Sequence, residues 1–122
     1  MRIFKNAWFR RFAKREKISE KRLQQAVLRA NDGLIDADLG GHVIKQRIAR
    51  TGQGKSGGFR TIIILKKEDK AFFVYGFAKN VQSNISKQEL RAFKQAAKEL
   101  LALSDKQIER LLKNKALTEI DL

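Results

Sequence analysis

The fold is decided by VIKQRI at residues 43–48, FRTIIIL at 59–65 and AFFVYGFA at 71–78. All three segments are dominated by β-branched and aromatic residues, which are the types enriched in strands. A connection with four glycines (51–58) joins the first two segments, and a short polar connection (66–70) joins the last two. Because both connections are hairpin-sized, we expect three consecutive strands in an antiparallel meander.

Helical signals precede these strands. Asn6 and Ser19 are suited to N-cap positions, and the apolar residues after each recur at intervals of three and four. Gly33 suits the left-handed position that follows a helix end. We therefore expect two antiparallel helices joined by a short turn. A short strand is expected before them at residues 2–4, and a connection after them at 34–41.

Two capping-box patterns follow the strands. Ser86 with Glu89 is expected to open one helix, and Ser104 with Gln107 is expected to open a shorter one. An alternation of polar and apolar residues at 118–122 then predicts an additional strand at an edge of the sheet.

These elements predict a small α+β fold made of a single domain over residues 1–122. Two N-terminal helices and a C-terminal helix are expected to pack on one face of a curved antiparallel sheet of three to four strands. A chain of 122 residues and 14.0 kDa is within the size range of one domain and is long enough to bury a core.

The composition excludes several kinds of chemistry. The chain has no cysteine, which excludes disulfides, cysteine-ligated zinc, iron–sulfur clusters and a thiol nucleophile. Because His42 is its single histidine, a histidine-rich metal site is also excluded, and we expect no metal and no cofactor. No apolar run reaches the ~18 residues of a membrane span, and the N-terminus lacks the apolar core of a signal peptide. We therefore expect a cytoplasmic protein without a membrane partner.

Positive charge is the strongest signal in the composition. Lys and Arg total 27 against 13 Asp and Glu, which gives a formal net charge of +14. An excess of this size favours polyanionic partners, namely nucleic acid, the ribosome or an acidic protein. The alternative is a basic surface that is simply solvated. Residues 42–60 contain no acid and five cations, which are Lys45, Arg47, Arg50, Lys55 and Arg60.

Gly54-Lys55-Ser56 is similar to part of a phosphate-binding P-loop but lacks the context of one. The full pattern needs a glycine at position 49, where this chain has Ala49, and a helix after the serine, where we expect a strand. Two interpretations stay open. Either the glycines let the backbone approach a polyanion while Lys55 supplies charge, or the segment is a plain hairpin loop.

The expected strand at 43–48 alternates isoleucines with cations, so Lys45 and Arg47 share one face. Arg60 on the next strand and Lys79 at the end of the third are expected to project onto the same concave face. Such a cluster suits RNA cleavage, because arginine stabilises phosphorane-like charge and a lysine crowded by cations can transfer protons. The alternative is a solvated charged face.

Other polar and aromatic residues have weaker signals. Tyr75 and Phe77 on the third strand are expected to offer surfaces on which bases of single-stranded RNA can stack. His42 is expected on the face opposite the cations, which favours a structural or surface role over that of a general base. Asp36 and Asp38 lie in the connection and have no evident partner. They either hydrate a turn or face nearby cations.

Three stretches of the chain, taken together, resemble the RelE/ParE superfamily of bacterial toxin–antitoxin toxins, and its HigB-like branch most closely. They are GLIDADLGG at 33–41, GQGKSGGFR at 52–60 and FFVYGFAKN at 72–80, and the resemblance covers nearly the whole chain. It implies a RelE-like fold and a ribosome-dependent mRNA endoribonuclease that cuts the codon in the A site and inhibits translation. It also implies a reaction without metal, the RNA 2′-OH as nucleophile and a 2′,3′-cyclic phosphate product. The implied partners are mRNA, the ribosome and a cognate antitoxin, usually a helix-turn-helix protein.

The resemblance also implies roles for individual residues. Arg60 falls on the family's Gly-aromatic-Arg position, which contacts the scissile phosphate. Lys45 and Arg47 fall on the basic pair of the preceding strand, one member of which has base-like duties. Lys79 matches a basic residue at the end of the following strand. Further contacts to RNA are expected from Arg50, Lys55, Tyr75, Phe77 and Asn80.

Two positions depart from the family pattern. Asn80 stands where many relatives carry another arginine, and Ser86 stands about where they carry a tyrosine or histidine near the C-terminal end. Because the superfamily also contains toxins that poison gyrase, a DNA gyrase inhibitor is one alternative function. A non-catalytic RNA- or ribosome-binding module is another.

Overall fold

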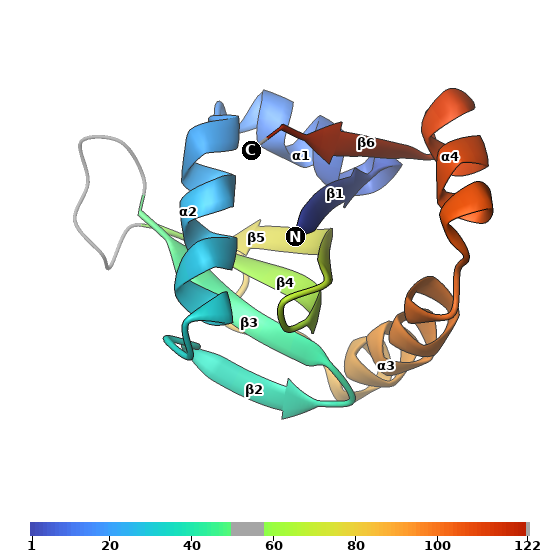
Figure 1. Cartoon of the computed structure of the whole chain (residues 1–122). Coiled ribbons are helices and arrows are strands. Elements are labelled where there is room, and N and C mark those ends of the chain that lie inside the picture. The colour runs from blue at the N-terminus through green and yellow to red at the C-terminus, as the bar shows by residue number, and fades with distance from the viewer. Residues whose placement is uncertain (50–57, 122) are drawn as a thin grey trace.

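The computed structural model describes residues 1–49 and 58–121, which form one six-stranded sheet and four helices within those ranges (Figure 1). In chain order the elements are β1 (Arg2–Asn6), α1 (Ala7–Arg15), α2 (Glu20–Asn31), β2 (Ala37–Gly40), β3 (Val43–Ile48), β4 (Phe59–Lys66), β5 (Lys70–Ala78), α3 (Lys87–Leu101), α4 (Asp105–Lys113) and β6 (Leu117–Ile120).

The sheet has the strand order β2-β3-β4-β5-β1-β6. The predicted meander is confirmed, since β3, β4 and β5 pair antiparallel in sequence order. The prediction of three to four antiparallel strands is wrong in number and in direction. β1 joins β5 in parallel, β6 pairs with the other side of β1, and β2 adds an edge strand beside β3.

The extra strand β2 lies within the segment that was expected to be a connection. It pairs Ala37 with Lys45 and Asp38 with Ile44, and its register then shifts before Gly40. β2 is only four residues long. Its alternation is limited to Ala37 and Leu39, of which Leu39 packs against the cluster of buried residues beneath α3 and α4, and so short a pattern does not distinguish a strand from a connection.

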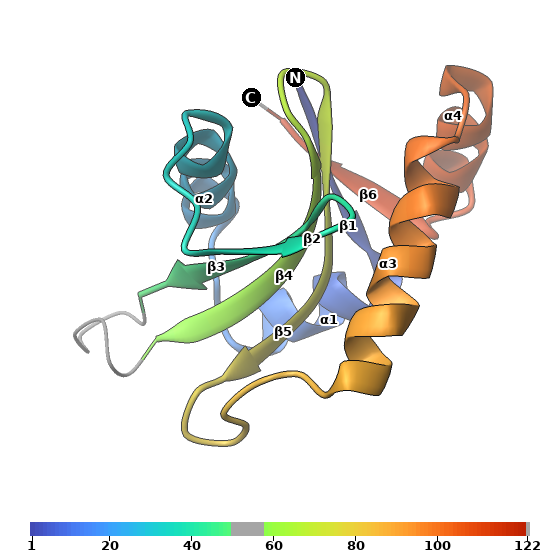
Figure 2. The same cartoon turned by 90° about the horizontal axis from the view of Figure 1, so that it is seen from below.

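The helices cover both faces of the sheet, which corrects the expectation of a single covered face. Figure 2 shows the sheet between α2 on one side and α3 and α4 on the other. Two separate clusters of buried residues fill these layers. α1 and α2 pack through residues such as Phe9, Leu23 and Val27, whereas α3 and α4 pack through Ala97 and Ile108.

β4 explains why both faces must be covered. Ile62, Ile63 and Ile64 are all fully buried, and they alternate between the two clusters. A strand whose consecutive residues are all apolar is typical of a sheet buried on both sides. The unbroken apolar run at residues 62–65 therefore already indicated that both faces of the sheet are covered.

The predicted helix caps are confirmed. The side chain of Asn6 accepts a hydrogen bond from the backbone N–H of Phe9, and that of Ser19 accepts one from Arg22. Both capping boxes form, at Ser86 and at Ser104. The two N-terminal helices are not antiparallel, however, because α1 runs across the direction of α2 (Figure 1).

A β-bulge in β5 determines which side chains face which layer. Ile62 pairs with Tyr75 but Ile63 pairs with Phe73, so Val74 is an additional residue in β5. After the bulge, Tyr75 and the residues that follow it have changed faces relative to a regular strand. Tyr75 therefore lies on the α3 and α4 side of the sheet, whereas Phe73 packs on the α1 and α2 side.

Candidate functional site

Three cations lie at one end of the sheet. They are on the same face as α3 and α4, which cover the other end of that face. Arg47 of β3 is the cross-strand partner of Arg60 of β4, and Lys45 pairs with Ile62 two positions along. The three cations have the same strand parity as Val43 and Ile64, which belong to the cluster beneath α3 and α4. The predicted shared face of Lys45, Arg47 and Arg60 is therefore confirmed, and we call it the cationic face.

Arg60 is partly buried, whereas Arg47 is exposed. Nη1 of Arg60 is buried and has no hydrogen-bond partner among the described residues. Burial lowers the pKa of the Arg60 guanidinium, and the positive charge of Arg47 lowers it further, whereas Asp36 raises it. Since buried donors are normally satisfied, an unsatisfied guanidinium nitrogen marks a position where an anion would be stabilised.

Asp36 pairs with the cationic face, although no partner was evident from the sequence. Its Oδ2 accepts a hydrogen bond from the backbone N–H of Arg47 at 2.7 Å. Its Oδ1 lies 3.7 Å from Nε of Arg47 and 3.7 Å from Nη2 of Arg29 on α2. Asp38 instead accepts a hydrogen bond from the backbone N–H of Gly40, within β2, where the register of the strand shifts.

Gln46 holds Asp36 in place. This fully buried side chain donates to the carbonyl oxygens of Ala26 and Leu34 and accepts from the backbone N–H of Asp36. It thereby ties α2 to the segment that leads into β2. Sequence reasoning missed Gln46, although a glutamine on the isoleucine face of a strand is itself a signal of a buried polar contact.

The segment between β5 and α3 also contacts the cationic face. Nζ of Lys45 donates to Oδ1 of Asn84 at 3.2 Å, and the hydroxyl of Tyr75 donates to Oε1 of Gln82 at 3.0 Å. Nε2 of Gln82 in turn donates to the carbonyl oxygen of Asn84. Sequence reasoning missed Gln82 and Asn84, because loop amides follow no periodicity.

The two aromatic residues predicted to stack on bases differ in how far their rings are exposed to solvent. Tyr75 is half-buried, with its ring centroid 4.6 Å from that of Trp8 and 5.6 Å from that of Phe93. Phe77 is only 4% exposed and lies with its ring 6.1 Å from that of Tyr75. Tyr75 therefore presents a surface to which a base has access, whereas the expectation that Phe77 offers a stacking surface is wrong, because its ring is buried.

The remaining predicted residues lie around this face. Lys79 and Asn80 are exposed in the turn after β5, and the backbone N–H of Lys79 is 3.5 Å from the carbonyl oxygen of Gly58. Arg50 and Lys55 lie outside the described residues, as does the segment similar to a P-loop.

His42, which was considered as a general base, and Ser86, which departs from the family pattern, both make structural contacts. His42 is exposed in the turn between β2 and β3, with φ of +67° and its Nδ1 3.1 Å from the carbonyl oxygen of Leu65. Arg60 is five residues from Leu65 along β4, so His42 sits at the opposite end of that strand. Ser86 is the N-cap of α3, bonded to Glu89 in both directions.

Across residues 1–49 and 58–121, no three carboxylate or histidine side chains lie close enough together to hold a metal ion. Within the same ranges, no helix combines the length and the apolar character that crossing a bilayer demands.

The sequence was also compared with known proteins. A comparison with curated proteins gives no match. Residues 1–120, almost the whole chain, match the family model described as the RelE toxin of the RelE/RelB toxin–antitoxin system. The resemblance seen in the motifs is thereby confirmed at the level of the family. The chain belongs to the RelE toxin family, whose members are the toxins of toxin–antitoxin systems and have an antitoxin as partner.

Proposed function

We propose that this toxin is a ribosome-dependent mRNA endoribonuclease of the HigB-like branch, which acts in the cytoplasm and stops translation by cutting the codon in the A site. Family membership supports the class of activity. The observation that carries the proposal is the buried Nη1 of Arg60, which has no protein partner among the described residues and faces the side of the sheet that Arg47 and Lys45 share.

The proposed reaction needs no metal ion. The 2′-oxygen of the cut nucleotide attacks the adjacent phosphorus while the bond from phosphorus to the 5′-oxygen breaks. The products are a 2′,3′-cyclic phosphate and a free 5′-hydroxyl, so the proton lost by the 2′-OH is matched by the proton that the leaving oxygen gains. Catalysis then requires a proton acceptor, a proton donor and positive charge beside the phosphate.

The role assigned to Arg60 is to stabilise the negative charge that develops on the phosphate oxygens. A guanidinium held on a rigid strand can contact two of these oxygens at once without reorganising. Arg47, its cross-strand neighbour, adds a second positive charge at the same position. Both groups stabilise the transition state more than the substrate, because the phosphate carries more negative charge there.

Lys45 and Lys79 are assigned to proton transfer. Lys45 is half-buried beside other cations, and its amino group is oriented by Asn84. Since Ser86 is occupied as a helix cap, it does not replace the tyrosine or histidine that relatives carry near this position.

The remaining contacts to mRNA are assigned to Tyr75 and Asn80, with Arg50 and Lys55 added on the sequence alone. Phe77 is buried and does not reach the RNA itself. The antitoxin, proposed to be a helix-turn-helix protein, would inhibit by covering the cationic face. A net charge of +14 favours an acidic partner segment, because it neutralises the cations and blocks the approach of RNA.

Primer extension on a defined mRNA in a purified translation system tests this function. We expect cuts within A-site codons and none when ribosomes are omitted. Intact mRNA with well-folded protein would contradict the proposal. Double-strand breaks in DNA would then indicate the gyrase alternative, and salt-sensitive ribosome binding without cuts would indicate a passive module.

A further inference from the structure

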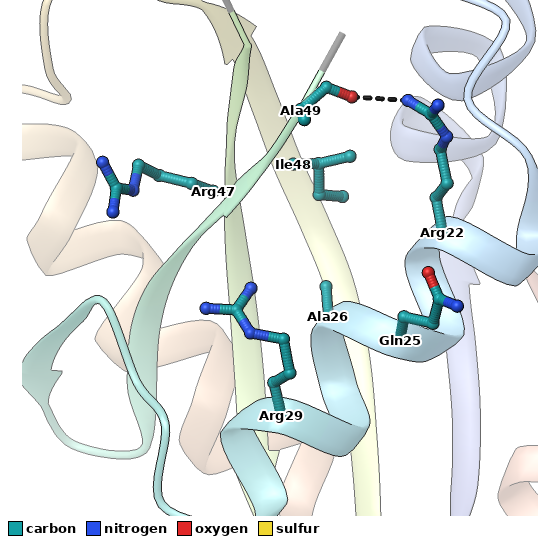
Figure 3. Close-up of a pocket in the computed structure, with 7 residues that line it drawn as sticks. All are labelled: Arg22, Gln25, Ala26, Arg29, Arg47, Ile48 and Ala49. Atoms are coloured by element: carbon teal, nitrogen blue, oxygen red, sulfur yellow. Dashed lines mark hydrogen bonds between the residues drawn. The ribbon is translucent and has the colours of Figure 1, made fainter. Parts of the chain in front are cut away.

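A second cluster of arginines lies between α2 and the edge of β3, and it shares Arg47 with the cationic face. Two adjoining hollows of about 280 and 290 Å³ meet there, and both are lined by Arg29, Arg47 and Ala49. Arg22 lines the first hollow and Asp36 lines the second. Figure 3 shows Arg29 extending from α2 toward β3, and Arg47 extending from β3 on the side away from α2. We call this group of Arg22, Arg29, Arg47 and Asp36 the arginine hollow.

We propose that the arginine hollow binds a backbone phosphate of single-stranded mRNA, next to the phosphate that Arg60 contacts. This inference rests on the proposed function, because it extends the path of the same RNA strand. It assigns to Arg22 and Arg29 of α2 a role in holding the substrate, separate from the chemistry on the cationic face.

The arginines are held in place by protein contacts. Arg22 and Arg29 are seven residues apart, or about two helical turns, so they lie on one side of α2. Nη1 of Arg22 donates to the carbonyl oxygen of Ala49 at 2.6 Å. One oxygen of Asp36 lies 3.7 Å from both Arg29 and Arg47, which draws the two guanidinium groups together.

The arginine hollow retains both charge and free donors. Three guanidinium groups and one carboxylate leave it with a net charge of +2. Separations of 3.7 Å are longer than hydrogen bonds, so the N–H groups of Arg29 and Arg47 remain available to a ligand. Their side chains are 47% and 48% exposed. A phosphate can therefore reach them and accept planar, paired hydrogen bonds.

The position of the arginine hollow makes it continuous with the cationic face. β2 pairs with β3 only as far as Lys45, so the outer edge of β3 is open at Arg47. The backbone N–H of Arg47 bonds to Asp36 instead of to a strand. Arg60, Arg47 and Arg29 therefore form a row that passes over this open edge to α2. An RNA strand whose scissile phosphate lies at Arg60 therefore places a neighbouring phosphate at the arginine hollow.

Fluorescence anisotropy with a short single-stranded RNA tests the proposal. The RNA carries 2′-O-methyl groups, so that binding is measured without cleavage. We expect Arg29→Gln to weaken binding about three- to tenfold and to reduce the slope of log K against log salt concentration by about 0.7, the loss of one phosphate contact. Arg29→Lys should restore the slope but only part of the affinity, because lysine keeps the charge and loses the planar fork.

Arg110→Gln is the matched control. It removes the same charge from α4, which lies across the sheet from α2 (Figure 2). The proposal predicts that this variant binds RNA as the wild type does. Equal effects of Arg29→Gln and Arg110→Gln would overturn it, and so would a wild type that does not bind the RNA. It would also be overturned if Arg29→Gln weakened the binding of the antitoxin alone.

The two proposals fail separately in these experiments. If programmed ribosomes show no cleavage while the effect of Arg29→Gln on RNA binding holds, the arginine hollow stands and the nuclease proposal falls. If cleavage is observed while Arg29→Gln binds RNA as the control does, the nuclease stands and the arginine hollow falls.

Discussion

Gln46 shows how much of the site depends on a residue that touches no substrate. Three backbone groups rely on its buried amide: two carbonyl oxygens, of Ala26 and Leu34, and the N–H of Asp36. Asp36 in turn fixes the backbone of Arg47. The alternation in the sequence predicted where Arg47 points, but not the contacts that hold it. Those contacts join residues that only the folded chain brings together.

Replacing Gln46 by leucine is expected to lower the free energy of unfolding by about 2–4 kcal/mol. Leucine fills a similar volume but leaves buried donors and acceptors without partners. Urea denaturation measures the change. Gln25→Leu on the exposed side of α2 is the control and should alter stability by less than about 0.5 kcal/mol. A loss below about 1 kcal/mol for the Gln46 variant would show that these hydrogen bonds do not organise the region.

Gly76 is a position where even a methyl group is too large. A Cβ added there would lie 2.6 Å from Cε2 of Phe12, which is itself buried and packed against Trp8 and Phe59. Gly76→Ala is therefore expected to cost about 1–3 kcal/mol of stability by overpacking.

A double-mutant cycle with Phe12→Leu separates this clash from a general effect of alanine in β5. We expect Gly76→Ala to cost clearly less when residue 12 is leucine, since the smaller side chain leaves room for the methyl group. Equal costs in the two backgrounds would contradict this account of Gly76.

At the scale of elements, the bulge in β5 places Tyr75 and Phe77. Strict alternation would put Tyr75 on the same side as Phe73, beneath α1 and α2. The additional residue Val74 moves it to the side that carries the cations. The sequence predicted a strand at 71–78 and named its aromatic residues, but a bulge leaves no mark in the composition. The sequence therefore predicted that a strand forms here, but it did not predict which face of the sheet each side chain occupies.

The α3 capping box gives a test of what Ser86 does. Its side chain accepts from the backbone N–H of Glu89, and the Glu89 side chain accepts from its N–H. Ser86→Ala should lower stability by about 1 kcal/mol, and Ser86→Asp should restore it, because aspartate is also a good N-cap. Thermal unfolding measures both variants.

The same variants test whether Ser86 takes part in catalysis. We expect well-folded Ser86→Ala to cleave mRNA at close to the wild-type rate. A large loss of cleavage with unchanged folding would show that the hydroxyl acts in the reaction.

A charged pair joins β1 to the edge strand β6. Nε of Arg2 donates to Glu119 at 2.8 Å, and Nη2 donates to the other oxygen at 3.0 Å. This hydrogen bonding lowers the pKa of Glu119, and burial opposes the shift in part. Because the folded pKa is below the ordinary value of 4.5, the stabilisation is present above that pH and is lost as the pH falls below it.

Glu119→Gln should therefore be less stable than the wild type at pH 7, and the difference should shrink as the pH falls below about 4.5. Both side chains are about one-third exposed, so solvent screening limits the difference to about 1 kcal/mol or less. Denaturation curves at neutral and acidic pH measure it. A difference that is constant with pH would show that the carboxylate charge is not its source.

At the scale of the whole molecule, local sequence patterns predicted some parts of the architecture and not others. The meander, the caps and the shared face of three cations follow from local patterns. The placement of β1 between β5 and β6, by contrast, joins β1 to residues 68 positions away in β5 and more than 110 positions away in β6. Such pairings depend on the packing of the entire chain, so local periodicity does not predict them.

The most direct test of the account is the single-turnover rate of A-site codon cleavage by Arg60→Ala on ribosomes programmed with a defined mRNA. Arg110→Ala serves as the control for charge, and ribosome binding is measured in parallel. We predict that Arg60→Ala cleaves about 30- to 1,000-fold more slowly, equivalent to about 2–4 kcal/mol of transition-state stabilisation, while it still folds and binds ribosomes. A cleavage rate equal to that of the wild type would contradict the central role of Arg60.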